Sequence, residues 1–326
     1  MVQQNSGATE TPIDAQQTDG TPNHLAPDLS TGAAWMNGRI MPIADASVPL
    51  NDWGLIHSDI TYDVVPVLDG AFFRLPLYLD RFLKSMQALR LDPDMDRPAI
   101  EAALHGLVAA SGLRKAYVAM VTTRGVNMVA GSRDPRDCKN RFFAWCVPYI
   151  HVIRPEIAQT GAHAHIARTV ARIPSESVDP RVKNYHWGDF TRGLFEAKDA
   201  GAETAILLDA AGNVTEGPGF NVFSVKNGRL ITPDSGVLEG ISRRTVLDIA
   251  REHGIAAEIR PLPLSEFMQS DEIFVTTSGG GVAPISRVDN RVFSNGVPGE
   301  ITNAIHRAYF EWATRPENRT EIAYPA

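Results

Sequence analysis

The chain has 326 residues, of which 44% are hydrophobic and 21% charged, and its formal net charge is −7. This composition is typical of a soluble globular protein, and the length allows two domains. The negative charge disfavours nucleic acid or an anionic membrane as the main partner, and no apolar run reaches the ~20 residues of a membrane span.

The N-terminal segment differs in composition from the rest of the chain. Residues 1–30 are rich in Gln, Thr, Ala, Asp and Pro and carry almost no large apolar residue, so we expect a flexible arm over residues 1–32. The start lacks the basic segment and apolar run of a secretory signal, which predicts a cytoplasmic location. The two cysteines, Cys138 and Cys146, indicate neither a disulfide framework nor a zinc site, and we expect no metal.

The next segment predicts a small α+β domain over residues 33–150. Asn37-Gly38 and Asp69-Gly70 each lie between short apolar runs, which is typical of a β-hairpin. Apolar spacing then predicts two helices and two strands, with the second helix stopped at Gly112. The expected helices cover residues 77–91 and 98–110, and the expected strands cover residues 115–124 and 141–149.

A larger, cofactor-binding domain is expected over residues 161–326, after a linker at residues 151–160 that contains Pro155 and shows little periodicity. Asn227-Gly228 predicts a further hairpin, and Ser242 is expected to be the N-cap of a helix. The expected strands are 164–171, 204–209, 221–226, 230–232 and 272–276, and the expected helices are 187–198, 242–252 and 301–312.

Two residues of this second half predict the chemistry. Lys183 lies in a loop with Pro180 and apolar neighbours, and burial would favour its neutral, nucleophilic amine. Glu216 lies among glycines in Thr-Glu-Gly-Pro-Gly, where a flat ring can approach the backbone. An amine for a Schiff base and a carboxylate for a pyridine nitrogen together indicate pyridoxal phosphate. The alternatives are a solvated surface lysine and a plain turn.

A phosphate site is predicted from hydroxyl groups and a helix start. Ser242 follows Gly240-Ile241 at a helix N-terminus, where free amides and the helix dipole bind anions. Thr276, Thr277 and Ser278 add hydroxyls, and Arg81 is the candidate guanidinium. Each of these alone is also compatible with a simple cap or a surface charge.

Four residues are candidates for the substrate pocket, although a lone His or Tyr is more often a structural group. They are His57, Tyr62, Arg133 and Trp187.

Several motifs in their order along the chain resemble the fold-type IV pyridoxal-phosphate enzymes, which include branched-chain and D-amino acid aminotransferases and aminodeoxychorismate lyase. The resemblance spans roughly residues 33–315 and is closest to (R)-selective amine transaminases. It implies an α+β fold of two domains, with a barrel-like mixed sheet in the larger one. The motifs are HSDITY (57–62), DPRVKNYHWGD (179–189), EGPGFN (216–221), GISR (240–243) and TTSGG (276–280), together with Arg81.

The resemblance also implies roles for individual residues. Lys183 would be the Schiff-base lysine and proton carrier, and Glu216 would pair with the pyridine nitrogen. Arg133 matches a mobile-loop arginine that meets the carboxylate of an acid substrate. Phosphate-binding positions are matched by Arg81, Ile241 (through its amide), Ser242 and Thr277, and pocket-lining positions by His57, Tyr62, Trp187, Thr276 and Ser278. A homodimer with the active site at the subunit interface is implied as well.

Two departures from the branched-chain enzymes indicate a more apolar pocket. Those enzymes place a tyrosine five residues after the lysine, where this chain has Gly188, and favour a polar residue at the position of Phe220. We therefore expect an (R)-selective amine transaminase that moves an amino group from a chiral primary amine to a keto acid such as pyruvate by a ping-pong mechanism. The alternatives are a branched-chain or D-amino acid aminotransferase, an aminodeoxychorismate lyase and a non-catalytic pyridoxal-phosphate-binding protein.

Overall fold

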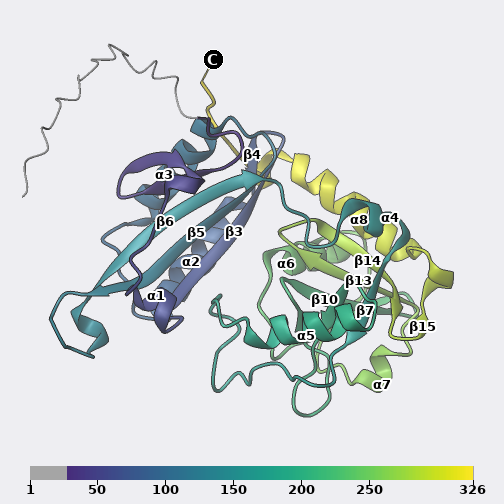
Figure 1. Ribbon diagram of the computed structural model, residues 1–326. Helices are drawn as coiled ribbons and strands as arrows, with labels where there is room; N and C mark the ends of the chain where they lie inside the picture. The colour runs from purple at the N-terminus through teal and green to yellow at the C-terminus, as the bar shows by residue number, and fades with distance from the viewer. Residues whose placement is uncertain (1–27, 326) are drawn as a thin grey trace, which may run out of the picture.

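The structure is a computed structural model that describes residues 28–325, so most of the expected N-terminal arm lies outside the described residues. The described chain forms two lobes, each built on one β-sheet (Figure 1). In these residues no helix is long and apolar enough to cross a membrane. The expected cytoplasmic location stays a prediction.

The first sheet is antiparallel throughout and has seven strands in the order β16-β4-β3-β5-β6-β1-β2. Both predicted hairpins are present at Asn37-Gly38 and Asp69-Gly70, whose residues all have positive φ as a type I′ turn requires. The strands are β1 (Ala33–Met36), β2 (Arg39–Pro42), β3 (Ile60–Leu68), β4 (Ala71–Phe73), β5 (Ala116–Asn127), β6 (Cys138–Pro148) and β16 (Arg319–Glu321).

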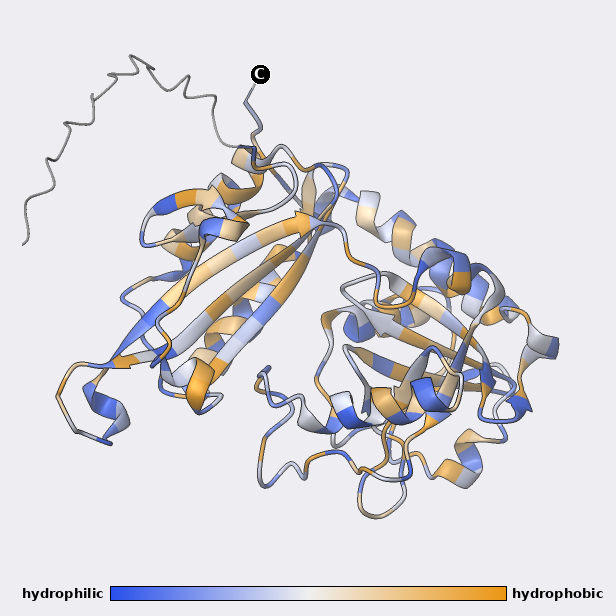
Figure 2. Ribbon diagram, in the orientation of Figure 1, coloured by the Kyte–Doolittle hydropathy of each residue, from blue (hydrophilic) through white to orange (hydrophobic). Residues whose placement is uncertain are grey.

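The two faces of this sheet pack against different parts of the molecule. Helices α2 (Leu75–Ala88) and α3 (Arg97–Ser111) cover one face and bury Val65 and Val67 of β3 in a large apolar core. Because side chains alternate along a strand, Tyr62 and Val64 point to the other face, toward the second lobe. Figure 2 shows hydrophobic residues along these strands and as stripes on the surrounding helices.

The second sheet has nine strands and mixes parallel and antiparallel pairs. Its strands are β7 (Ala162–Ile166), β8 (Thr204–Ile206), β9 (Glu216–Gly217), β10 (Phe220–Lys226), β11 (Arg229–Thr232), β12 (Ala257–Ile259), β13 (Glu272–Thr277), β14 (Gly281–Val288) and β15 (Arg291–Val292). The other helices are α1 (Trp53–Ile56), α4 (Pro155–Thr160), α5 (Gly188–Asp199), α6 (Ile241–Glu252), α7 (Leu264–Phe267) and α8 (Glu300–Thr314).

The second sheet closes on itself. The Leu207 amide donates to the Glu216 carbonyl (3.0 Å) and the Thr215 amide donates to the Leu207 carbonyl (3.0 Å), which joins the end of β8 to β9. Strand β9 pairs with β10, so β10, β13, β14, β7, β8 and β9 form a ring. This closure confirms the expected barrel-like sheet, and α6 and α8 pack against its outer face.

The free backbone amides at the N-termini of α8 and α6 differ in their hydrogen-bond partners. Helix α8 begins after Gly299 without a cap of its own, but Glu272 of β13 accepts hydrogen bonds from the amides of Ile301 (3.1 Å) and Thr302 (2.8 Å). Helix α6 begins after Gly240 and has no side-chain cap. The prediction that Ser242 is the N-cap is wrong, because Ser242 lies inside the first turn and its hydroxyl contacts Tyr309.

The other predicted elements are confirmed, with shifts at their ends. The strand expected over residues 164–171 ends at Ile166, because the chain leaves the sheet there. The strand expected to stop at residue 124 continues to Asn127 through a register shift at Gly125, whose φ of 78° suits glycine. Helix α4 lies inside the expected linker, and β16 near the C-terminus returns to the first sheet. The division into domains stays a prediction.

Candidate active site

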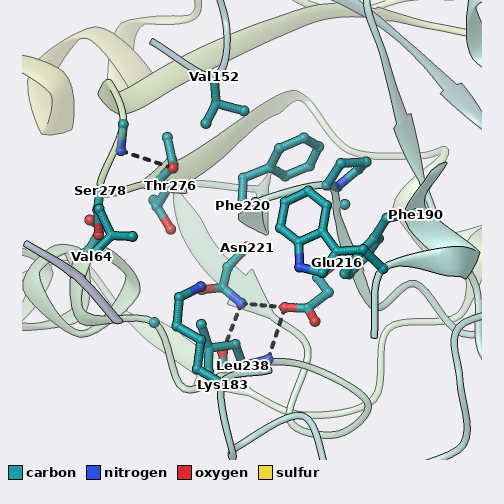
Figure 3. A pocket seen from close by; sticks show the side chains of 18 of the residues that line it. Val64, Val152, Lys183, Phe190, Glu216, Phe220, Asn221, Leu238, Thr276 and Ser278 are labelled. Carbon is teal, nitrogen blue, oxygen red and sulfur yellow. Dashed lines mark hydrogen bonds between the residues drawn. The ribbon is translucent and has the colours of Figure 1, made fainter. Parts of the chain in front are cut away.

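A cavity of about 300 Å³ lies between the two lobes and brings together most of the predicted site residues (Figure 3). Strands β3 and β5 of the first sheet form one wall, and loops at the ends of the second sheet form the others. The predicted residues that line it are Tyr62, Arg81, Lys183, Trp187, Glu216, Ile241, Ser242, Thr276, Thr277 and Ser278.

Two predicted pocket residues do not line this cavity. His57 lies at the end of α1, where its ring packs edge-on against Trp53 at 4.6 Å, and it lines a neighbouring cavity of about 650 Å³. The two cavities share Asn184 and His186. Arg133 is exposed on the turn between β5 and β6. The substrate-binding roles of His57 and Arg133 stay predictions.

The carboxylate of Glu216 is buried and hydrogen-bonded through both oxygens. Oε2 accepts from the Leu238 amide (2.9 Å) and from the Asn221 amide group (3.3 Å), as Figure 3 shows. Oε1 accepts from Arg172, at 3.1 Å from Nη2 and 3.3 Å from Nε. Burial raises the pKa of Glu216, and the charge of Arg172 opposes that rise.

Arg172 is a site residue that the sequence did not reveal. It is buried, donates to Asp189 as well as to Glu216, and lies over the Phe190 ring at 4.3 Å. Arginines are mostly exposed, and no motif marks this one, so only the fold shows its position. Asp189 belongs to the motif that contains Lys183, but the sequence offered no role for it.

The structure gives the glycine after Glu216 a packing role that the sequence did not reveal. A Cβ on Gly217 would lie 2.2 Å from the Phe220 ring and 2.4 Å from the Ala205 carbonyl oxygen. Gly217 therefore allows close packing of β9 against β10 and β8. Gly217 also lines the cavity, and the expectation that it admits a ligand ring stays a prediction.

Lys183 is anchored by its backbone and enclosed by aromatic rings. Its carbonyl accepts hydrogen bonds from the Thr61 hydroxyl (2.7 Å) and the Tyr62 amide (3.2 Å) of β3. Its amine lies 4.3 Å from the centre of the Tyr62 ring, which stacks on Tyr185 at 4.1 Å. Although the residue is partly exposed, its amine is surrounded by protein, and burial lowers the pKa of Lys183. The neutral, nucleophilic form is thereby favoured.

The opposite end of the cavity is suited to an anion. The N-terminus of α6 lies there with no side-chain cap, so its first amides and the helix dipole face the cavity. The Arg81 guanidinium donates to Asp63 (2.7 and 2.8 Å) and to the Glu239 carbonyl (2.9 Å). These bonds use three of its five N–H donors and leave two for a ligand.

One buried hydroxyl at this cavity lacks a partner within the described residues. The Thr276 Oγ1 atom is buried with no hydrogen bond, which is costly unless a ligand supplies one. By contrast, Ser242 contacts the Tyr309 hydroxyl (2.9 Å) and Thr277 accepts from the Gly279 amide (3.1 Å). An anion site at one end, an acid at the other and an amine between them fit pyridoxal phosphate.

Comparison with known proteins agrees with this fit. A family model described as amino-transferase class IV matches residues 61–288. A putative branched-chain-amino-acid aminotransferase from Methanocaldococcus jannaschii is 32% identical over 86% of this chain and 96% of its own length. A D-alanine aminotransferase from Listeria monocytogenes is 25% identical over 88% of this chain and 98% of its own length.

Solved structures show the same similarity. The branched-chain amino acid aminotransferase from Thermobaculum terrenum in its PLP form has a TM-score of 0.78 and 27% identity, covering 89% of this chain and 98% of that chain. The chain therefore belongs to the class IV aminotransferases and has the fold-type IV architecture. It is a pyridoxal-phosphate-dependent aminotransferase, and the roles of its individual site residues stay predictions.

We expect the rate at which the apoenzyme captures pyridoxal phosphate to rise with pH and to level off above a midpoint lower than 10.5, the ordinary lysine pKa. Only the neutral amine attacks an aldehyde, and burial of Lys183 makes that form abundant at lower pH. Stopped-flow absorbance over a pH series measures the midpoint, with Lys183→Ala as the blank. A midpoint at or above that of free lysine would contradict the assigned environment.

We expect Arg81→Gln to weaken pyridoxal-phosphate binding by about tenfold to a hundredfold, since a hydrogen bond to a charged group contributes ~1.5–3 kcal/mol. The variant should also have a lower Tm, because Asp63 is left buried and unpaired. Arg97→Gln is the matched control, since Arg97 also donates to an aspartate and a carbonyl but lies on the surface. Equal losses in both variants, measured by cofactor titration, would refute the role of Arg81.

Proposed function

We propose that this aminotransferase is an (R)-selective amine transaminase that passes an amino group from a chiral primary amine to a keto acid such as pyruvate. The observation that carries the proposal is the set of apolar side chains that line the cavity on several sides, among them Val64, Val152, Phe190 and Phe220 (Figure 3). Such a lining suits a hydrocarbon substituent better than a carboxylate.

Gly188 supports the same proposal. It is the first residue of α5, and no atom lies within 4 Å of the place where its Cβ would be. The branched-chain enzymes that this chain resembles place a tyrosine there, so this chain lacks that hydroxyl group. Gly188 is exposed and is not among the residues that line the cavity, so its support for the proposal is the missing hydroxyl and not added room.

A branched-chain or D-amino acid aminotransferase is the second candidate. The names of the relatives favour it over the first candidate, since they are branched-chain and D-alanine aminotransferases. Two arginines of the described residues line the cavity: Arg172 is paired with Glu216 and Asp189, and Arg81 is the proposed partner of the cofactor's phosphate. Neither is then available to an α-carboxylate. That arrangement favours the amine over the amino acid as donor.

Different residues of the cavity have different roles in the proposed reaction. Bound pyridoxal phosphate supplies a ring that accepts the electrons released when the substrate's C–H bond breaks. Lys183 Nζ removes that proton and later returns it, which its lowered pKa permits. Arg81, Ser242 and the first amides of α6 would hold the phosphate, and Glu216 would pair with the ring nitrogen. Release of the ketone before the keto acid binds makes the proposed reaction ping-pong.

An assay with (R)- and (S)-1-phenylethylamine and pyruvate tests the proposal, with L-leucine and D-alanine as competing donors. We expect acetophenone from the (R) amine alone, because a fixed face of attack by Lys183 and unequal substituent pockets select one enantiomer. The readout is acetophenone absorbance, and Lys183→Ala is the inactive control. Turnover of an amino acid donor without turnover of either amine would support the second candidate instead.

We propose that Arg133 meets the carboxylate of the keto acid when its turn moves toward the cavity. It is exposed on the β5–β6 turn, where Pro135 lines the neighbouring cavity that shares Asn184 and His186 with the first. A charge that can move away suits a pocket that takes an apolar amine in one half-reaction and an acid in the other.

We expect Arg133→Ala to raise the pyruvate concentration needed for half-saturation by about tenfold or more and to leave the amine half-reaction unchanged. Arg136→Ala is the matched control, since Arg136 is exposed on the same turn and paired with Asp134. Single-turnover kinetics of each half-reaction measure both effects. Unchanged saturation by pyruvate in Arg133→Ala would remove this role.

We also propose that the enzyme is a homodimer that buries the exposed apolar residues around α1. Leu50, Leu55 and Ile56 are 86%, 57% and 53% exposed, and the last two come immediately before His57. An apolar patch of this kind is typical of an interface, and its burial would bring His57 next to a second subunit.

We expect the wild-type enzyme to have a dimer's mass by light scattering and Leu55→Asp to dissociate at higher concentrations than the wild type. Val292→Asp is the matched control, because Val292 is equally exposed (56%) but lies on β15 at the far side of the second lobe (Figure 1). A monomeric wild type, or equal weakening by both substitutions, would contradict the proposed interface.

A further inference from the structure

One guanidinium lies between two buried carboxylates beside the cavity. Arg172 donates to Glu216 Oε1 through Nε and Nη2, and to Asp189 Oδ2 through Nη1 at 2.6 Å. The side chains of these three residues are at most 7% exposed. Arg172 and Glu216 line the cavity, while Asp189 lies behind them.

The position of Arg172 is fixed from several directions. Its amide donates to the Leu208 carbonyl (2.8 Å), and its guanidinium lies over the Phe190 ring at 4.3 Å. Asp189 is itself held by the amides of Ile173 (3.0 Å) and Phe190 (2.8 Å). Asp189 therefore acts as a rigid support that aims Arg172 at Glu216.

The charges of the cluster leave one negative charge uncompensated. Two carboxylates and one guanidinium carry a net charge of −1 when all three are ionised. A buried net charge is costly, so the cluster favours a positive group in the cavity next to Glu216. A protonated ring nitrogen is such a group.

The proton between Glu216 and a ring nitrogen has two possible positions. Either the carboxylate is ionised and the nitrogen carries the proton, or the carboxyl carries it and the nitrogen is neutral. Arg172 stabilises the first state, since its Nη2 atom lies 3.1 Å from Oε1 and its positive charge favours the ionised carboxylate. Moving the proton changes no covalent bond other than N–H and O–H and transfers no electron.

We propose that Arg172, supported by Asp189, is a positioning residue that decides which partner holds this proton and keeps it on the cofactor's ring nitrogen. The inference rests on the proposed role of Glu216. The charges of Lys183 and Arg243 also act on Glu216. Within the described residues, however, only Arg172 donates hydrogen bonds to this carboxylate from a charged group.

The test is the ¹⁵N NMR signal of ring-labelled pyridoxal phosphate in the holoenzyme at a fixed neutral pH. We expect a protonated-pyridine signal in the wild type and a shift toward neutral pyridine in Arg172→Gln. Arg172→Lys, which keeps the charge, should restore the signal at least in part. Asp189→Asn removes the charge that supports Arg172 and brings the cluster to a net charge of zero, so its signal should also shift toward neutral pyridine, but by less than in Arg172→Gln.

Two further variants show whether a negative result contradicts the role of Glu216 or only the role of Arg172. Glu216→Gln should also lose the protonated signal; if it does not, both the role of Glu216 and this inference fall. If Glu216→Gln loses the signal and Arg172→Gln keeps it, the inference alone is wrong. Arg124→Gln, an arginine of the other lobe that is similarly buried and paired with Asp59, should change nothing.

A measurement on the wild type keeps the inference testable if Arg172→Gln does not fold. The inference requires an ionised Glu216 in the holoenzyme. Isotope-edited infrared spectroscopy, with Glu216→Gln to assign the band, should therefore show no carboxylic-acid C=O absorption from this residue. A carboxylic-acid band that disappears in Glu216→Gln would overturn the inference.

Discussion

The buried carboxylate of Glu216 is the interaction around which this site is arranged. It lies on β9, the two-residue strand that closes the ring of the second sheet, so its backbone is held by both neighbouring strands. A charge in that position must be compensated by donors. The donors are Arg172, Asn221 and Leu238, which belong to three separate segments of the chain. The hydrogen bonds to this one carboxylate therefore hold three segments of the cavity wall in place.

The two ends of the cavity differ in electrostatic character, and this difference matches the cofactor. The Glu216 end has an excess of negative charge, whereas the other end has Arg81 and the uncapped start of α6. Glu272 accepts hydrogen bonds from the first amides of α8, whereas no side chain caps the first amides of α6, which face the cavity. A molecule with a phosphate at one end and a basic nitrogen at the other is complementary to this gradient.

Local signals in the sequence predicted most of the elements and much of the site. The Asn-Gly and Asp-Gly pairs predicted hairpins because their backbone preferences act over four residues. The motifs around Lys183 and Glu216 predicted the cofactor because Schiff-base chemistry requires those groups. The pairing of β16 with β4 was not predictable in this way, because it joins residues that lie far apart in the sequence.

The features that the sequence did not predict are contacts between residues from different elements of the fold. Asp63 of β3 holds Arg81 of α2, and Arg172 reaches Glu216, but neither pairing has a spacing rule in the sequence. Ser242 resembles an N-cap by composition, yet its hydroxyl is used by Tyr309 of a distant helix. His57 is five residues from Tyr62, but the turn after α1 directs it into a different cavity.

The return of the chain to the first sheet affects how the two lobes can move relative to each other. The polypeptide enters the second lobe after β6 and comes back through β16, which pairs with β4 beside β3 (Figure 1). The second lobe is thus tethered by two covalent connections, where a simple two-domain chain has one. Rotation about the line that joins the two connections disturbs them least, so we expect the cavity to open and close mainly by this hinge motion and less by twisting or sliding.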